Sequence, residues 1–189
     1  MILTNLYLEK SDLVFKECSQ ALKSVNPDNV FQYINLIQSA DKIYFVGVGR
    51  VLLSLKAICK RYAHLGLKTF IVGDTTEPAM TDRDVLIVGS GSGETLIPLK
   101  IAEKAKVIGA KVIHIGSNPD SSMKDYSDLF VRIPVKSKAN KSDEIQSRQP
   151  MTSLFEQSLL LFGDITAIII VEINDIQMDQ LWEFHANLE

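Results

Sequence analysis

The sequence predicts an α/β protein: a flavodoxin-like, doubly wound sheet of five parallel strands, preceded by N-terminal helices and followed by a long C-terminal helix. Between residues 43 and 133, short apolar runs rich in β-branched residues alternate with stretches of helical periodicity. These runs lack the apolar–polar alternation of half-exposed strands, so we expect both faces of the sheet to be covered, as in parallel sheets. The chain has 189 residues and shows no internal repeat, which favours one domain over residues 1–189.

The N-terminal segment, residues 1–40, is expected to contain two helices. The first has a face of apolar side chains at helical spacing, namely Leu8, Leu13, Phe15, Cys18, Ala21, Leu22 and Val25. Pro27 follows Asn26 and favours the start of a second helix, because proline is tolerated at the first helical position. The inward face of this second helix is expected to carry Val30, Ile34, Leu36 and Ile37.

The alternating region is expected to supply the whole sheet. The strands are expected at residues 43–46, 69–72, 85–88, 112–115 and 129–133, and the main helices at residues 52–65 and 95–107, with a short helix near Met123. Gly66 and Gly109 follow the two main helices, and glycine is typical just after a helix. Ligands of doubly wound sheets bind beyond the carboxyl ends of the strands, which here means residues 47–50 and 89–95.

The last third of the chain breaks the alternation. Residues 136–150 are polar and predict a long loop, either a mobile lid or a disordered segment. Residues 151–171 predict a helix that is apolar around most of its circumference, suited to the core and to a subunit interface. The tail, residues 178–189, carries Trp182 and Phe184 as well as a histidine, His185.

Composition excludes several functional classes. The net charge of −3 and the isoelectric point of about 5.7, with no basic stripe, exclude nucleic acid as a partner. The N-terminus does not match a signal peptide, and we expect no apolar run to approach a bilayer span. Cys18 and Cys59 are expected to be reduced core thiols, so we expect a cytoplasmic protein. The hydrophobic content of 46% leaves apolar surface for subunit contacts.

The loop after the third predicted strand is the strongest functional signal. Residues 89–95 read Gly-Ser-Gly-Ser-Gly-Glu-Thr and lead directly into a helix. Glycines let the backbone approach an anion, and the N–H groups and dipole of a helix start favour negative charge. Ser90, Ser92 and Thr95 add hydroxyl groups. The loop has no lysine, so it suits one phosphate of a small metabolite better than a nucleotide; the alternative is a simple helix cap.

From about Asp41 to the C-terminus, the chain resembles the sugar isomerase (SIS) domain family and, within it, the 6-phospho-3-hexuloisomerases. The general SIS signal is the loop at residues 89–95. More specific matches are Gly47-Val48-Gly49-Arg50, Arg61-Tyr62-Ala63-His64-Leu65-Gly66, Val72-Gly73-Asp74-Thr75, Gln149-Pro150-Met151-Thr152-Ser153-Leu154-Phe155-Glu156 and His185-Ala186-Asn187-Leu188-Glu189. The resemblance implies a SIS fold and an isomerase acting on a small phosphorylated ketose.

The resemblance also implies a specific reaction. D-arabino-hex-3-ulose 6-phosphate and D-fructose 6-phosphate would interconvert through a cis-enediol, as in the ribulose monophosphate pathway. It implies no metal and no organic cofactor. It implies a homo-oligomer, commonly a homotetramer, with active sites at subunit contacts.

The resemblance assigns roles to individual residues. Glu156 would be the proton acceptor, and His185 would move a proton between the two oxygens or open the sugar ring, in a neighbouring subunit's site. The phosphate would be held by Ser90, Gly91, Ser92, Gly93, Glu94 and Thr95, and the sugar by Gly49, Arg50 and Val51. His64 is a further candidate, although a structural role is favoured, and His114 is expected in the core.

The chain departs from the family after the first strand. The family usually has Gly-Arg-Ser-Gly there, whereas this chain has Val51 and Leu52 after Gly49-Arg50. Loss of the serine hydroxyl leaves two alternatives open: a sugar-phosphate-binding SIS protein without turnover, or an isomerase of another phosphosugar. A dinucleotide site is disfavoured, because the third glycine of its fingerprint would fall at Leu52.

Overall fold

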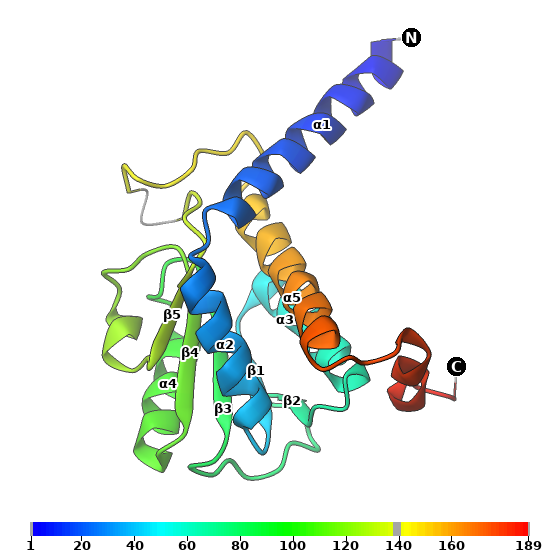
Figure 1. Ribbon diagram of the computed structural model, residues 1–189. Helices are drawn as coiled ribbons and strands as arrows, with labels where there is room; N and C mark the ends of the chain where they lie inside the picture. Colours follow the sequence, from blue (N-terminus) through cyan, green and yellow to red (C-terminus); the bar gives the residue numbers. More distant parts are fainter. Residues whose placement is uncertain (1, 138–140, 189) are drawn as a thin grey trace.

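The computed structural model describes residues 2–137 and 141–188 and shows one five-stranded parallel sheet with helices on both faces (Figure 1). The strand order is β2-β1-β3-β4-β5, which confirms the flavodoxin-like prediction. The strands are β1 (Ile43–Val46), β2 (Thr69–Ile71), β3 (Val85–Gly89), β4 (Lys111–Gly116) and β5 (Leu129–Arg132). The order reverses at β1, which pairs with β2 through Phe45↔Ile71 and with β3 through Val46↔Val88. The β1/β3 ends therefore form the switch point.

Alternate residues of each buried strand enter two separate cores. Toward one face, Ile43 and Phe45 pack with α1 (Ile2–Lys23), α2 (Pro27–Ser39), α3 (Gly49–His64) and α5 (Ser153–Ile173). Toward the other face, Tyr44 and Val46 pack with α4 (Leu96–Ile108) and the short η1 (Ser122–Asp125). Successive side chains of a strand point to opposite faces of the sheet. A strand of consecutive apolar residues therefore contributes side chains to both cores.

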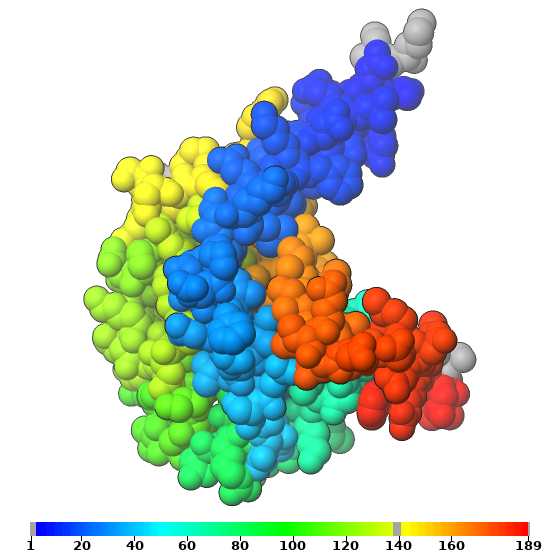
Figure 2. All heavy atoms as spheres, viewed as in Figure 1, coloured from blue at the N-terminus to red at the C-terminus, as the bar shows by residue number. Residues whose placement is uncertain are grey.

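The N-terminal helix is only partly covered. Of the predicted apolar face, Cys18, Ala21 and Val25 are buried, whereas Leu8 and Phe15 are 56% and 72% exposed in the single chain. The physical reason is visible in Figures 1 and 2: the first half of α1 projects beyond the sheet and its helices. An apolar pattern predicts a helical face but does not supply the surface that covers it.

The helix α5 runs along the core face with one side buried. Its length and mean hydropathy of 1.8 meet the composition of a membrane span, which overturns our expectation that no stretch would do so. The most apolar window is 61% buried, mainly against α3 and α1. On the open side Leu161, Ile165 and Ile168 are 39%, 41% and 54% exposed.

The boundaries differ from prediction at one place that concerns function. α3 begins at Gly49, three residues before the expected Leu52, after the extended residue Val48. This first turn is set by backbone hydrogen bonds such as Leu52 N–H to Val48 O, and its sequence carries no apolar periodicity. Arg50 and Val51 are therefore helical residues rather than loop residues. The predicted ends Gly66 and Gly109 are confirmed, both with positive φ.

Candidate active site

Three segments meet at the carboxyl edge of the sheet, near the switch point. They are the first turn of α3, the loop at residues 90–95 and the start of α5. Arg50 of α3 forms an ion pair with Glu156 of α5. A Cβ placed on Gly91 would lie 3.6 Å from the Phe155 ring, so the loop also touches the first turn of α5. The topology thus brings together the two regions that the sequence indicated and adds α5.

The loop is held by its own hydroxyl groups. Ser90 is 3% exposed, and its Oγ accepts the Gly93 N–H at 3.1 Å and lies 3.2 Å from Thr95 Oγ1. Ser92 Oγ accepts the Glu94 N–H at 3.3 Å. Gly93 has a φ of +68°, which favours glycine. The Ser90 hydroxyl therefore stabilises the loop through hydrogen bonds inside it, whereas the side chains of Ser92 and Thr95 are partly exposed to solvent.

Glu94 ties the loop to the neighbouring 3₁₀ turn. Its carboxylate accepts the Ser122 N–H at 2.7 Å and the Ser122 hydroxyl at 2.8 Å. These two bonds, the backbone one first, hold the pKa of Glu94 below its usual value. The structure thus gives Glu94 a supporting partner on η1 that the sequence pattern did not indicate.

A buried histidine supports the loop from below. His114 on β4 is 1% exposed, and its Nε2–H donates to the Ser90 carbonyl at 2.9 Å. Burial lowers the pKa of His114 to about 4, so the ring is neutral at pH 7. Because a carbonyl only accepts, the proton lies on Nε2. The predicted core position of His114 is confirmed.

Glu156 is a buried carboxylate at the N-terminus of an apolar helix. It is 7% exposed and accepts from Arg50 Nε on Oε2 and from the Thr152 hydroxyl on Oε1, the latter at 2.8 Å. Ser54 on α3 donates to the Glu156 backbone carbonyl at 2.8 Å, which fixes the helix turn itself. The Arg50 side chain is 64% exposed and can leave this position for a ligand. A hollow of about 210 Å³ lies beside the pair, lined by Arg50, Leu53, Ser54, Glu156, Gln157 and Leu160.

The predicted substrate residue Val51 faces the ends of the strands. A Cβ on Gly89 would lie 2.8 Å from Val51 Cγ1, and one on Gly47 would lie 3.3 Å from it. Val51 therefore fills the space between the β1 and β3 ends with a methyl group. Gly49, with φ of +58°, makes the sharp entry into α3 that places Arg50 over this edge.

The two candidate histidines, His64 at the end of α3 and His185 in the C-terminal tail, lie beside each other and away from Glu156. His185 stacks on His64 with ring centroids 5.0 Å apart, and Trp182 packs on His185 at 5.0 Å. His64 ends α3, fourteen residues after Arg50, which is roughly 21 Å along the helix at 1.5 Å per residue. The single chain therefore does not bring His185 or His64 to Glu156.

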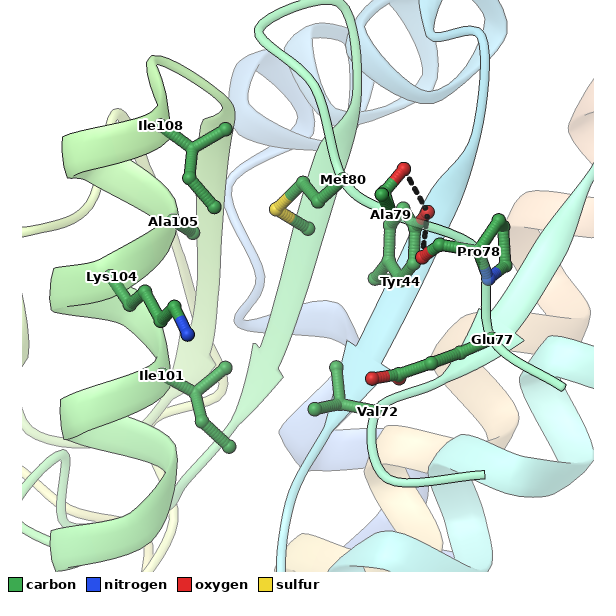
Figure 3. A pocket seen from close by; sticks show the side chains of 10 residues that line it. All are labelled: Tyr44, Val72, Glu77, Pro78, Ala79, Met80, Ile101, Lys104, Ala105 and Ile108. Atoms are coloured by element: carbon green, nitrogen blue, oxygen red, sulfur yellow. Dashed lines mark hydrogen bonds between the residues drawn. The ribbon is translucent and has the colours of Figure 1, made fainter. Parts of the chain in front are cut away.

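Another pocket lies away from this edge. It has about 300 Å³ and lies on the α4 face, between α4 and residues 72–80 (Figure 3). Its lining is mainly apolar, and the Tyr44 hydroxyl beneath it lies 3.0 Å from the Pro78 carbonyl. Across residues 2–137 and 141–188, no three His, Cys, Asp or Glu side chains gather as a metal site requires.

Two residues that contact Glu156 were not assigned a role from sequence. Thr152 was named only as part of the Gln149–Glu156 motif, and Ser54 was not named. A spacing of four residues puts Thr152 and Glu156 on one helix face, which is a usable signal. The contact from Ser54 spans 102 residues and leaves no local trace in the sequence.

Comparison with known proteins places the chain and its fold in a family. The SIS domain model matches residues 36–162. The 3-hexulose-6-phosphate isomerases of Bacillus subtilis and Mycobacterium gastri are 34% and 36% identical to this chain, covering 93% and 94% of it and 95% and 88% of their own lengths. A solved Methanococcus jannaschii structure, from which a 3-hexulose-6-phosphate isomerase function was inferred, aligns with a TM-score of 0.83 at 30% identity, covering 96% of this chain and 99% of that one. The chain belongs to the SIS domain family.

Proposed function

We propose that this protein is a phosphosugar isomerase that interconverts D-arabino-hex-3-ulose 6-phosphate and D-fructose 6-phosphate. The observation that carries the proposal is the buried Glu156 carboxylate, paired with Arg50 at the same sheet edge as the loop at residues 90–95. The names of relatives that are 34% and 36% identical over most of the chain support the same activity.

The loop would bind the phosphate. Its backbone leads into the N-terminus of α4, where helix N–H groups favour an anion. Ser92 Oγ accepts one bond, so its hydroxyl hydrogen remains available to donate to a phosphate oxygen, and the Thr95 hydroxyl would do the same. Gly91 and Gly93 would let the backbone approach closely, and Glu94 would hold the loop against η1. The phosphate anchors the sugar so that its C2–C3 bond faces α5.

Glu156 would transfer the proton between carbons. From the 3-ulose, it takes the C2 proton and the electron pair forms the C2=C3 enediol. The protonated Glu156, whose proton can exchange with solvent, then returns a proton to C3, while a second proton moves from O2 to O3. A base for this step must be held in place beside the carbon that loses its proton. Arg50 and Thr152 hold the Glu156 carboxylate in the free protein. Arg50 would then turn to the enediolate oxygens and stabilise their developing charge.

His185 would move the proton between the oxygens in the site of a second copy. It lies near the far end of α3, so one chain cannot bring it to its own Glu156. We propose a homotetramer in the cytoplasm, with exposed apolar faces of α1 and α5 available for contacts. Co-expressed Glu156→Gln and His185→Ala chains test this. Mixed oligomers should regain activity that neither variant has alone; no recovery would place His185 outside the site.

Hydrogen exchange tests the reaction itself. Fructose 6-phosphate in D₂O should gain deuterium at C3 and yield the 3-hexulose phosphate, followed by NMR. Glu156→Gln should slow exchange by about 10²–10⁴-fold, the usual contribution of a general base, and still bind the sugar. Glu172→Gln is the matched control, because Glu172 is exposed on the same helix. Full activity in Glu156→Gln would refute the assignment of the base.

A second function is favoured by one observation. Val51 places a methyl group at the switch point where a family serine would offer a hydroxyl. One lost hydrogen bond to a charged oxygen weakens binding by about 1.5–3 kcal/mol. Binding of fructose 6-phosphate without exchange would indicate a sugar-phosphate sensor. Exchange with a pentose or heptose phosphate instead would indicate an isomerase of another substrate.

A further inference from the structure

A buried carboxylate on α1 holds the segment that leads into α5. Glu17 on α1 is 7% exposed, although carboxylates are rarely buried without partners. Its Oε2 accepts from the Ser147 hydroxyl at 2.7 Å and from Gln149 Nε2 at 3.0 Å. Its Oε1 accepts the Arg148 N–H at 2.9 Å. All three donors belong to one tripeptide, 130–132 residues away in the sequence.

The same turn of α1 also touches α5. Cys18 Sγ donates to Gln157 Oε1 at 3.4 Å, directly after Glu156. Between the tripeptide and α5 lie only Pro150, Met151 with a φ of +56°, and Thr152. Thr152 holds Oε1 of Glu156 at 2.8 Å. A short, bent connection thus joins the Glu17 contacts to the base.

The charge of Glu17 is maintained by these contacts. Burial alone would raise the pKa of its carboxyl group, but hydrogen bonds from Arg148, Ser147 and Gln149 outweigh burial and lower it below the usual value. The Arg148 guanidinium adds attraction in the same direction. Glu17 is therefore ionised at neutral pH, where a charged acceptor makes the stronger hydrogen bonds.

The other end of the polar segment has a matching anchor. Glu144 is 4% exposed, and its Oε1 accepts from the hydroxyls of Ser117 and Ser137 at 3.1 and 2.6 Å. Its Oε2 accepts the N–H groups of Ser137 and Lys141. Residues 138–140 lie outside the described residues, and the lid role of residues 136–150 stays a prediction. In the described part, two buried carboxylates hold this segment to the fold.

We propose that Glu17 is a positioning residue for the active site: it clamps residues 147–149 onto α1 and thereby fixes Thr152 and Glu156 at the start of α5. This inference rests on the proposed role of Glu156 as the base. Glu17 itself does not touch the substrate. Its removal should slow the chemical step without weakening binding of the phosphate, which is held by a different loop.

The test uses Glu17→Gln in the full chain, with Asp12→Asn as control. Asp12 lies on the same helix and is exposed. In Glu17→Gln, the glutamine keeps the size of the side chain but brings an N–H₂ group against three hydrogen-bond donors. Trypsin cleavage after the exposed Arg148 should rise on the order of tenfold, and kcat with fructose 6-phosphate should fall on the order of tenfold, with KM within about twofold. Asp12→Asn should change neither.

Each outcome decides the inference. If trypsin cleaves Glu17→Gln faster but kcat is unchanged, Glu17 holds residues 147–149 on α1 but does not position Glu156. If kcat falls but the rate of trypsin cleavage is unchanged, Glu17 does not act by holding residues 147–149 on α1. If Glu17→Gln does not fold, Ser147→Ala, which removes one of the three donors, should give a smaller change of the same two kinds, and no change refutes the inference. A wild-type protein that binds fructose 6-phosphate but does not turn it over overturns the proposed function itself, and the positioning role falls with it.

Discussion

Acidification should destabilise the protein through the histidine beneath the loop. His114 is 1% exposed, donates to the Ser90 carbonyl at 2.9 Å and packs against Phe130 with ring centroids 4.9 Å apart. A protonated ring in this position would place a positive charge away from water. Burial therefore lowers the pKa of His114 from 6.5 to about 4.

The sign and size of the effect follow from this pKa. Between pH 6.5 and 4 the unfolded chain binds a proton at His114 and the folded chain does not, so the free energy of unfolding falls as the pH falls. The difference of 2.5 pKa units, at 1.36 kcal/mol per unit, gives about 3 kcal/mol in total. By pH 5, about 2 kcal/mol of this is lost relative to pH 7.

Urea unfolding of the wild type and of His114→Gln at pH 7, 6 and 5 measures this contribution. Glutamine retains a hydrogen-bond donor but does not titrate, so the fixed cost of the substitution is the same at each pH. The free-energy gap between the two proteins should shrink by about 2 kcal/mol from pH 7 to pH 5. A gap that stays constant, or an NMR titration of His114 near pH 6.5, would refute the reasoning.

Three further substitutions test other contacts. Gly93→Ala should weaken binding of fructose 6-phosphate by about tenfold or more in calorimetry, because φ is +68° and the new Cβ would lie 2.1 Å from Ser121 Oγ; unchanged affinity would contradict this. Gly163→Ala should lower the free energy of unfolding in urea by about 1–3 kcal/mol, because its Cβ would lie 2.3 Å from Ile58 Cγ1. Thr152→Val should lower kcat by about tenfold with little effect on KM, since it removes the hydroxyl that holds the base; equal kinetics would deny Thr152 that role.

Much of the fold could be predicted because its signals are local. The apolar run at residues 85–88 and the glycine at 109 each specify an element boundary, and β3 and α4 formed where expected. The protruding half of α1 could not be predicted from its pattern. Helical periodicity at Leu8 and Phe15 indicates an apolar face, but whether that face meets this chain or another surface depends on tertiary placement.

The candidate site could also be predicted only in part, where its residues stand in local motifs. The loop at residues 90–95 and Glu156 stand in motifs, so the sequence points to them directly. The ion pair between Arg50 and Glu156 spans 106 residues and follows only from the packing of α3 on α5. Val51 was expected to leave a gap in hydrogen bonding, but its inward orientation, against Gly89, emerged only from the backbone.

The polar segment at residues 136–150 shows what composition alone leaves open about the environment of a loop. Polar residues predict solvent exposure when their partners are water, but a carboxylate can equally be satisfied by N–H and hydroxyl groups. Glu144 and Glu17 are satisfied in this way by residues of the segment and its surroundings. Backbone donors have no sequence signature, and the Glu17 contacts span at least 130 residues. Glu17 stands beside the core residue Cys18 in the sequence, and a charged residue in such a position needs a polar partner once it is buried. The identity of that partner, residues 147–149, follows only from the tertiary structure.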